Sequence, residues 1–270
     1  MIFKKIKHQG MIYHVNPEFA EKLLECNFKD NDQDITPLVE MGRYRSICVS
    51  KKINMVIKNN TLTTFRRRLY THFGVQGLSG RFSLVDEYKN LKALSHIDFV
   101  PKVYAFGKCS RFPIKEERLI IEYYEDALTA DEMLRLYPEK KNLIISMVFQ
   151  LFLKAWNSKF AHMDPHLRNI LFLRCGNIIF IDFECCYLNP KDKDFYMGFS
   201  TGYFFHFWAY KYISETEYST SVQEFISENC SDLNMRIFNL YFERFKISKV
   251  SRKKRFKCFS SVRERRKLII

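Results

Sequence analysis

The pattern of apolar and polar positions divides the chain into a strand-rich first part and a helix-rich second part. Residues 44–60 contain two β-rich runs on either side of the polar turn SKK, a pattern typical of a hairpin. Three leucines and a tyrosine fall on one helical stripe over residues 84–94, so a helix is expected there. Residues 99–108 and 118–124 are predicted to be strands. Pro101 and Gly107 are expected to limit the first of these strands.

Helical patterns dominate the second part. A helix is expected to begin at Thr129, because threonine is a good N-cap and acidic residues follow in the first turn. A long apolar helix is expected over residues 138–158, and aromatic helices from residue 195 onward. Between them, two apolar runs around a Cys-Gly-Asn turn predict a second hairpin over residues 170–182. This order of elements predicts an α+β protein of two lobes, joined at residues 123–128.

The expected domain boundaries follow from that division. Residues 1–122 are assigned to an N-terminal lobe, which begins with a variable segment at residues 1–38. Residues 123–248 are assigned to a C-terminal catalytic lobe, and residues 249–270 to a basic tail. The stretch from residue 63 to residue 80 is basic and glycine-spaced, so a partly mobile loop is expected there.

The composition is that of a globular protein with a strong positive charge. A chain of 270 residues with 47% hydrophobic and 27% charged residues can bury a full core, which excludes a disordered chain. The formal net charge of +14 draws the protein toward nucleic acid, anionic lipid or phosphorylated glycan. The longest apolar stretch, residues 143–156, is too short to span a bilayer, and the basic N-terminus lacks the apolar region of a secretory signal. We therefore expect a soluble or peripheral protein.

The cysteines give no sign of a disulfide scaffold or a zinc domain. Eight cysteines occur without any CxxC pair, and no His/Cys cluster has the spacing of zinc ligands. Cys185 and Cys186 are adjacent, which makes a bond between them awkward. We expect reduced thiols in a cytosolic protein.

The segment HMDPHLRNILFLRCGNIIFIDFE, residues 162–184, carries the candidate chemistry. Asp164, Asn169 and Asp182 lie beside its two apolar runs, and a buried carboxylate is costly unless it is paired. Because the hairpin brings the two ends of the segment together, the three side chains can converge. Phosphoryl transfer can use such a set, since it needs a base for a hydroxyl and oxygen ligands that hold Mg²⁺ against phosphates. His162 is expected to pack against the loop backbone rather than to act in catalysis.

The segment matches the protein-kinase-like pattern, here H-M-D-P-H-L-R-N and D-F-E. That pattern requires, further upstream, a lysine on a strand that reaches the nucleotide phosphates and a glutamate on the next helix that holds it. Lys58, in MVIK, ends the second strand of the first hairpin, and Glu87 lies on the next expected helix. Taken alone, Lys58 would be an edge lysine and Glu87 an exposed carboxylate; the ordered set favours the kinase interpretation.

Three features depart from protein kinases. The glycine-rich loop is reduced to residues 41–45, Met-Gly-Arg-Tyr-Arg, without G-x-G-x-x-G. Glu184 stands where D-F-G has its glycine, and no A-P-E follows, so no activation segment for a protein substrate is visible. The run GVQGLSG at residues 74–80 has the wrong spacing and follows Lys58, so it is interpreted as a loop.

Over roughly residues 40–215 the chain resembles the bacterial lipopolysaccharide core sugar kinases, the heptose and Kdo kinase family. The resemblance lies in these stretches: VIK, FRRRL, the E-Y-x-x-L-x-x-L helix at Glu87, VPKVYAFG, LIIEYYEDALTADEML, HMDPHLRNILF and FIDFE. It implies a two-lobed protein-kinase-like fold, with a small β-rich N-lobe carrying one main helix and a larger, mainly helical C-lobe. It also implies transfer of the ATP γ-phosphate to a sugar hydroxyl, of heptose or Kdo, in the inner core.

The resemblance assigns roles by position. Asp164 is the expected catalytic base, and Asn169 and Asp182 are the expected Mg²⁺ ligands. The residues expected to contact ATP are Lys58, Glu87, Glu122 and Tyr123. Lys58 and Glu87 would anchor the phosphates, whereas the lobe joint would offer backbone groups to adenine.

The expected partners follow from the resemblance and the charge. The acceptor would be lipid-linked core oligosaccharide, which is made at the cytoplasmic face of the inner membrane. Arg66–Arg68, the tail around Arg252–Arg255 and Arg263–Lys267 could dock on that anionic surface, which predicts a cytoplasmic, peripheral location. The competing interpretation is a solvated tail. Nucleic-acid binding is not expected, because no nucleic-acid motif accompanies the charge.

Other functions stay open from the sequence. One alternative is a protein Ser/Thr kinase; another is a small-molecule kinase, since Glu184 is similar to the residue in choline and aminoglycoside kinases. A non-enzyme alternative is a kinase-like binding module or a basic nucleic-acid binder. The complete set of candidate residues favours an active kinase over an inactive one.

Overall fold

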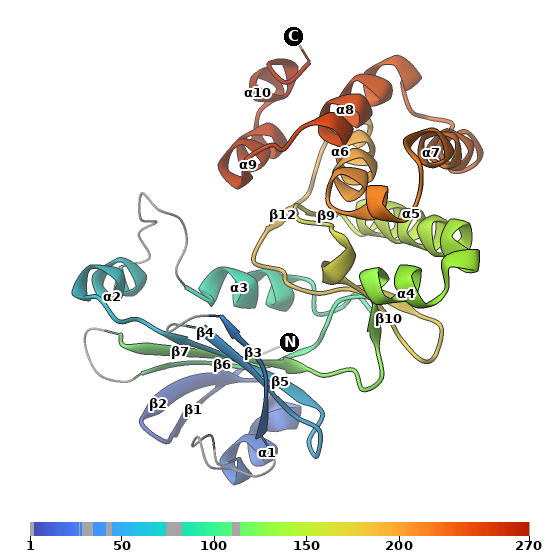
Figure 1. Ribbon diagram of the computed structural model, residues 1–270. Coiled ribbons are helices and arrows are strands. Elements are labelled where there is room, and N and C mark those ends of the chain that lie inside the picture. Colours follow the sequence, from blue (N-terminus) through green and yellow to red (C-terminus); the bar gives the residue numbers. More distant parts are fainter. Residues whose placement is uncertain are drawn as a thin grey trace. The chain divides into compact units, whose positions relative to one another are not determined.

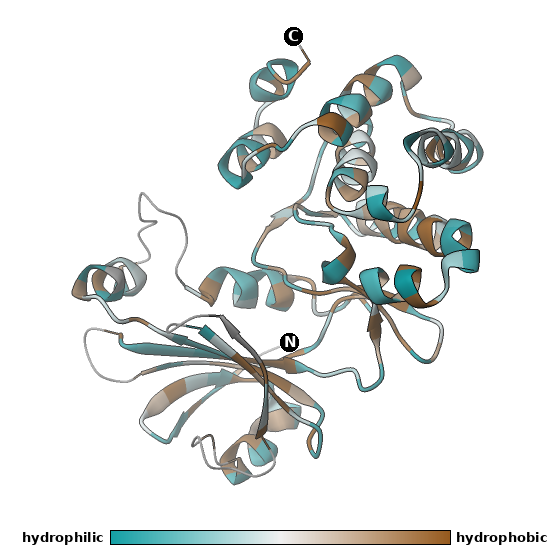
Figure 2. Cartoon of the chain, in the orientation of Figure 1, coloured by the Kyte–Doolittle hydropathy of each residue, from teal (hydrophilic) through white to brown (hydrophobic). Residues whose placement is uncertain are grey.

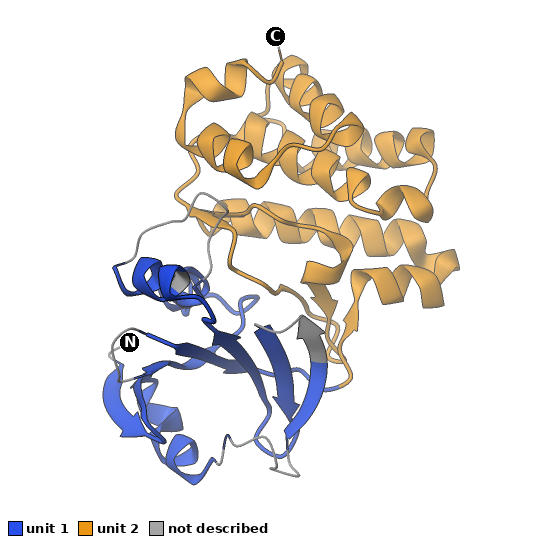
Figure 3. Cartoon of the chain, turned by 60° about the vertical axis from the view of Figure 1, so that its left-hand side comes forward, with its two compact units in different colours: residues 1–125 blue, residues 126–270 orange. Residues whose placement is uncertain are grey.

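The computed structural model describes residues 3–26, 28, 35–41, 45–73, 83–109 and 114–269. The chain forms two compact units, Met1–Glu125 and Asp126–Ile270, shown in blue and orange in Figure 3. The division between them lies within the joint expected at residues 123–128.

A seven-stranded antiparallel sheet forms most of unit 1 (Figure 1), in the order β1-β2-β6-β7-β5-β4-β3. Its strands are β1 (Lys4–His8), β2 (Met11–Val15), β3 (Ile35–Met41), β4 (Arg45–Ser50), β5 (Met55–Thr61), β6 (Val103–Cys109) and β7 (Glu116–Glu122). The first hairpin is β4–β5, and β6 and β7 are the two strands predicted after it. The sheet positions Lys58 on β5, in register with Leu119 of β7.

Unit 1 also contains elements that the sequence did not predict. The segment expected to be variable, residues 1–38, supplies β1 and β2, which extend the sheet at its edge, and the helices η1 (Pro17–Phe19) and α1 (Ala20–Glu25). The basic stretch after residue 63 forms helix α2 (Phe65–His72), where a loop was expected. The run of glycines at residues 74–80 lies outside the described residues.

Helix α3 (Val85–Ala93) is attached to the sheet by the buried carboxylate of Glu117 on β7. This carboxylate accepts hydrogen bonds from the Ser83 hydroxyl at 2.7 Å, the Leu84 N–H at 2.9 Å and the Asn60 amide at 3.1 Å. A buried carboxylate is costly without such donors. The contact fixes the start of the helix three residues before Glu87.

Unit 2 is mainly helical. Its helices are α4 (Ala130–Leu136), η3 (Pro138–Lys140), α5 (Lys141–Asn157), η4 (Leu167–Asn169), α6 (Lys193–His206), η5 (Ala209–Lys211), α7 (Glu215–Asn229), α8 (Met235–Ile247), α9 (Arg252–Ser260) and α10 (Val262–Arg266). Its short strands are β8 (Leu128–Thr129), β9 (Phe160–His162), β10 (Ile170–Phe172), β11 (Ile178–Phe180) and β12 (Cys186–Leu188). The predicted helix start is confirmed, because Thr129 and Glu132 form a capping box.

Helices α6 and α8 lie side by side in unit 2 and approach closely at two glycines of α6 (Figure 1). A Cβ atom on Gly198 would lie 2.8 Å from the Phe238 carbonyl oxygen, and one on Gly202 would lie 2.4 Å from the Phe242 carbonyl oxygen. Only glycine permits this distance. The close contact fixes the C-terminal end of α6, where Tyr203 follows Gly202.

The C-terminal residues correct the expectation of a basic tail at residues 249–270. They form α9 and α10, which are largely hydrophilic in Figure 2, but Cys258 and Phe259 of α9 and Leu268, which follows α10, are buried. Arg255 and Arg265 are also buried. The run resembles a solvated tail because its buried residues are separated by lysines and arginines that face outward.

The observed architecture is an α+β fold with a β-rich N-terminal unit and a mainly helical C-terminal unit, which confirms the predicted fold class. Within the described part of the chain, no helix has the length and apolar character needed to cross a bilayer. All eight cysteines lie in the described part of the chain, and none of them forms a disulfide there.

Candidate active site

Lys58 and Glu87 form the ion pair that the sequence predicts within unit 1. The Lys58 Nζ lies 2.6 Å from a carboxylate oxygen of Glu87, and the two side chains are only 15% and 3% exposed. The sheet supplies the lysine and helix α3 supplies the glutamate. Such a sheltered pair can hold an ammonium group in one place for a phosphate, so its role in nucleotide binding stays a prediction with suitable geometry.

Backbone hydrogen bonds in unit 2 bring the ends of the candidate segment together. His162 on β9 is in register with Cys186 on β12, and the Met163 N–H donates to the Cys185 carbonyl at 2.9 Å. At the other end, the Ile181 N–H donates to the Asn169 carbonyl at 2.9 Å, just beyond the β10–β11 hairpin. The loop that carries Asp164 is therefore tied on both sides to the chain around Asp182.

His162 packs against the backbone of the loop that carries Asp164, as the sequence predicted. Its Nε2 lies 3.0 Å from the carbonyl oxygens of both Ile181 and Asp182, and its Nδ1 accepts a hydrogen bond from the Asp164 N–H at 3.4 Å. Burial lowers the pKa of His162, which favours the neutral ring with its proton on Nε2. The ring stacks on Phe180, so the histidine is a structural residue.

The side chains of Asn169 and Asp182 fit the expected role as Mg²⁺ ligands. The Asn169 amide group donates to the Asp164 carbonyl at 3.0 Å, which directs its nitrogen away from a metal and leaves its oxygen as the ligand. Asp182 adopts a left-handed backbone conformation with φ of 61°, which costs roughly 1–2 kcal/mol for a residue other than glycine and is common at functional sites. The described residues contain no cluster of three or more acidic, His or Cys ligands, so phosphate oxygens and water would complete the coordination.

Asp164 has two side-chain partners that the sequence did not reveal. The Tyr203 hydroxyl, on α6, donates a hydrogen bond to the Asp164 carboxylate. The Arg255 guanidinium, on α9, lies 3.5 Å from the same carboxylate oxygen and donates to the Tyr203 hydroxyl oxygen at 2.9 Å. Tyr203 was hidden in an aromatic helix, and Arg255 in a basic run interpreted as a docking surface.

A cavity of about 390 Å³ opens at Asp164. Its lining residues come from the candidate loop, from the end of α6 and from the start of α9: Asp164, His166, Tyr203, Phe207, Trp208, Lys249, Val250, Ser251, Arg252 and Arg255. Burial lowers the pKa of His166, so this side chain is neutral near pH 7. The cavity is large enough for a small polar group beside the carboxylate.

Two further residues of the segment have local partners. The Arg168 guanidinium lies 4.1 Å from the centre of the Trp208 ring and 3.6 Å from the Asp131 carboxylate. Glu184, which replaces the glycine of protein kinases, lies 3.2 Å from the Arg252 guanidinium. Glu184, which stands in place of the D-F-G glycine, therefore attaches the start of α9 through its ion pair with Arg252.

The joint residues Glu122 and Tyr123 use their N–H groups within unit 1. The Glu122 N–H donates to the Lys102 carbonyl at 2.9 Å, and the Tyr123 N–H donates to the Asn54 carbonyl at 3.0 Å. An adenine contact at these two residues would therefore use their carbonyl groups. In the reduced glycine loop, residues 42–44 lie outside the described residues.

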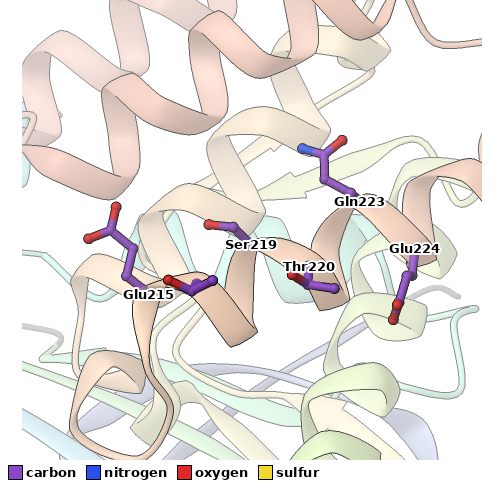
Figure 4. A pocket seen from close by; sticks show the side chains of 6 residues that line it. Glu215, Ser219, Thr220, Gln223 and Glu224 are labelled. Carbon is purple, nitrogen blue, oxygen red and sulfur yellow. The ribbon is translucent and has the colours of Figure 1, made fainter.

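A second hollow, of about 540 Å³, lies along α7 (Figure 4). Its lining residues all belong to this one helix: Glu215, Thr216, Ser219, Thr220, Gln223 and Glu224. None of the predicted site residues lies there. The cavity at Asp164 is therefore the better candidate for a substrate site.

The comparisons with known proteins give no close relative. No protein-family model matches the chain, and no curated protein matches it. Among solved structures, the chain is similar to the bifunctional kinase-methyltransferase WbdD, with a TM-score of 0.49 and 16% identity over 84% of this chain and 46% of that chain. A co-crystal structure of WbdD with a kinase inhibitor gives a TM-score of 0.48 and 16% identity, over 80% of this chain and 46% of that chain. The chain thus spans less than half the length of the WbdD chains that it matches.

Proposed function

We propose that the chain is an ATP-dependent phosphotransferase that phosphorylates a sugar hydroxyl, of heptose or Kdo, in the inner core of lipopolysaccharide. One observation carries the proposal of a kinase. In unit 2, backbone hydrogen bonds and the Asn169 side chain hold Asp164, Asn169 and Asp182 together. In unit 1, Lys58 forms an ion pair with Glu87. Phosphoryl transfer requires little beyond positioning and charge stabilisation, which these residue types supply. The sugar acceptor rests on the sequence resemblance.

Each residue has a definite task in the proposed reaction. Asp164 accepts the proton of the acceptor hydroxyl, whose oxygen bonds to the γ-phosphorus of ATP as the bond to the β-phosphate oxygen breaks and ADP leaves. Lys58, held by Glu87, neutralises charge on the phosphates. Asn169 and Asp182 supply side-chain oxygens to Mg²⁺, which when bound stabilises the charge on the transferring group.

The proposed acceptor is lipid-linked core oligosaccharide at the cytoplasmic face of the inner membrane. Exposed basic residues of α9 and α10 support an approach to such an anionic surface: Lys253, Lys257, Arg263 and Arg266. Arg255 and Arg265 do not contribute, because they are buried and lie beside Asp164 and Asp192. The other proposed docking region is Arg66–Arg68. There, the Arg66 side chain donates a hydrogen bond to the Tyr70 hydroxyl on α2.

The direct test is transfer of labelled γ-phosphate from ATP and Mg²⁺ to dephosphorylated core lipopolysaccharide, with basic protein and amino alcohols as rival acceptors. We expect label in the glycan and none in the rivals. Label in protein or in an amino alcohol, and none in the glycan, would support the fold and reject the sugar acceptor. Absence of transfer to every acceptor would reject the kinase.

A further inference from the structure

The cavity at Asp164 is lined in part by the start of α9, a segment that the catalytic roles above do not use. Lys249, Arg252 and Arg255 belong to this part of the lining, together with Val250 and Ser251. Ser251 caps α9 by accepting a hydrogen bond from the Lys254 N–H at 3.3 Å, so the helix begins at the cavity. The C-terminal segment is therefore part of the wall of the candidate site.

Arg255 is built into the site rather than exposed on a surface. Only 5% of this residue is exposed, and its guanidinium donates to the Tyr203 hydroxyl at 2.9 Å and to the Val250 carbonyl at 3.2 Å. Its other terminal nitrogen lies 3.5 Å from the Asp164 carboxylate. A buried arginine with three oxygen partners is rigid, so it positions Asp164 and adds a fixed positive charge to the cavity.

The cavity lining carries an excess of positive charge. Lys249, Arg252 and Arg255 face a single carboxylate, that of Asp164, among the lining residues. Arg252 is also paired with Glu184, and Arg255 with Asp164. Lys249 is exposed and has no ion pair within the described part of the chain. An anion that entered the cavity would gain a direct partner in Lys249 and a close guanidinium in Arg252.

Three aromatic residues also line the cavity: Tyr203, Phe207 and Trp208. The Tyr203 ring stacks on Phe207 with ring centres 4.2 Å apart, and the Arg255 guanidinium lies 4.6 Å from the centre of the Tyr203 ring. Trp208 has a backbone φ of 89°, which is an outlier for a bulky residue and is common where a side chain is held for a ligand. Rings that combine an apolar face with a polar tip suit a ligand that has apolar faces and polar edges, as a sugar ring does.

We propose that this cavity is the acceptor site and that Lys249 and Arg252 select a sugar that already carries a phosphate or carboxylate near the accepting hydroxyl. The aromatic lining packs against the sugar ring, Lys249 and Arg252 bind the anion, and Asp164 receives the hydroxyl proton. A reaction that adds an anionic sugar, or an anionic group, to the glycan must therefore precede this phosphorylation. The reaction assigned to the cavity rests on the proposed function, whereas the binding of an anionic sugar stands on the cavity itself.

Binding can be measured without turnover, because the chain has two tryptophans and one of them lines the cavity. In a Trp156→Phe variant, Trp208 reports alone. The probes are a hexose phosphate, a hexuronic acid, a neutral hexose and inorganic phosphate. We expect the fluorescence of Trp208 to report at least about tenfold tighter binding of an anionic sugar than of the neutral hexose or of inorganic phosphate, since charge-assisted hydrogen bonds have about this effect. The hexose phosphate and the hexuronic acid identify which anion is preferred.

The basic lining residues are tested by Arg252→Gln and Lys249→Gln in the same background, with Lys253→Gln as the matched control. Lys253 is an exposed residue of α9 that does not line the cavity. Each of the first two changes should weaken the binding of the anionic sugar about tenfold, and the control should leave it unchanged. Equal binding of all four probes, or an equal effect of all three variants, would overturn the inference.

Turnover separates this inference from the proposed function. Two core oligosaccharides that differ only in the anionic group are compared as acceptors, and we expect kcat/KM to be at least about tenfold higher for the anionic one. Equal transfer to both acceptors would overturn the inference and keep the proposed function. Anion-dependent binding at Trp208 without transfer to either acceptor would keep the binding site and reject the proposed reaction.

Discussion

At the scale of single residues, the central feature is a carboxylate held in one orientation. The Asp164 side chain is 32% exposed, accepts a hydrogen bond from the Tyr203 hydroxyl and lies beside the Arg255 guanidinium. Its backbone N–H donates to His162. In the proposed role of a base, a carboxylate that is fixed in this way avoids reorganisation when a hydroxyl approaches, which is a main source of catalysis in phosphoryl transfer.

The Tyr203 hydroxyl should therefore matter for turnover more than for stability. Tyr203→Phe removes one hydrogen bond to Asp164 and keeps the ring, so we expect kcat to fall about tenfold with little change in acceptor KM. Steady-state kinetics and thermal unfolding would measure this. The matched control is Tyr212→Phe, because Tyr212 donates to Asp131 at 2.7 Å in a similar pair elsewhere in unit 2. A kcat within twofold of wild type would contradict the positioning role.

The cysteines should differ sharply in reactivity. Burial raises the pKa of Cys185 to about 11 and that of Cys258 to about 11, so at pH 8 only about one thiol in a thousand would be the reactive thiolate. Cys175 is exposed. Brief alkylation of the native protein at pH 8, followed by peptide mass spectrometry, should label Cys175 first and spare the other two. Equal labelling in the native state would refute the buried positions, and equal labelling in denaturant is the control.

At the scale of secondary structure elements, the packing of α6 against α8 positions the end of α6 that lines the cavity. A methyl group on Gly202 would meet backbone atoms, which cannot move as a side chain can. We expect Gly202→Ala to lower the free energy of unfolding by about 1–3 kcal/mol, as overpacking does. Urea denaturation measures the change, with Thr220→Ala on the exposed side of α7 as a control near zero. Full stability of Gly202→Ala would show that the two helices do not approach so closely.

The elements that could be predicted from the sequence are those with a strong local signal. The apolar stripe before Leu94, the hairpin at residues 170–182 and the threonine cap at residue 129 each depend on neighbours within a few positions. The proximity of Asn169 to Asp182 also follows from the hairpin alone. These elements hold two of the predicted site residues, Glu87 and Asp182, and the hairpin begins directly after a third, Asn169.

The remaining parts of the site depend on contacts between distant residues. Tyr203 is 39 positions from Asp164, and Arg255 is 91 positions away. Such contacts are set by tertiary packing, and neither residue has a periodic or motif signal that points to the loop. The strands β1 and β2 were missed for a related reason, since β1 is an edge strand whose residues, KKIKH, are mostly polar. Sequence patterns indicate which residues are buried and where turns occur, but they do not indicate which distant residues are in contact.

At the scale of the whole molecule, the net charge of +14 is divided between structural and exposed groups. Arg255 and Arg265 are buried beside carboxylates, whereas Lys257 and Arg263 are exposed. Only the exposed groups can contact a membrane, and each basic residue near an anionic surface contributes about 1 kcal/mol. The basic C-terminal segment therefore combines part of the lining of the cavity at Asp164 with a proposed docking surface.

Sedimentation with phosphatidylserine vesicles tests that surface. We expect the double variant Lys257→Glu with Arg263→Glu to lose most of its vesicle binding, and the binding of wild type to weaken as salt is raised. Lys22→Glu, at an exposed lysine of α1 in unit 1, is the control and should bind as wild type does. Unchanged binding of the double variant would place any membrane contact elsewhere on the protein.

The most direct test of the central claim compares wild type with Asp164→Asn in two measurements on the full chain. Binding of Mg²⁺ and ATP is measured by calorimetry, and phosphate transfer to core oligosaccharide is measured by label. The account predicts nucleotide affinity within a few-fold of wild type and a turnover lower by about 10²–10⁴, because the change removes the base and keeps the shape. Turnover equal to wild type would contradict the assignment of Asp164, and with it the proposed active site.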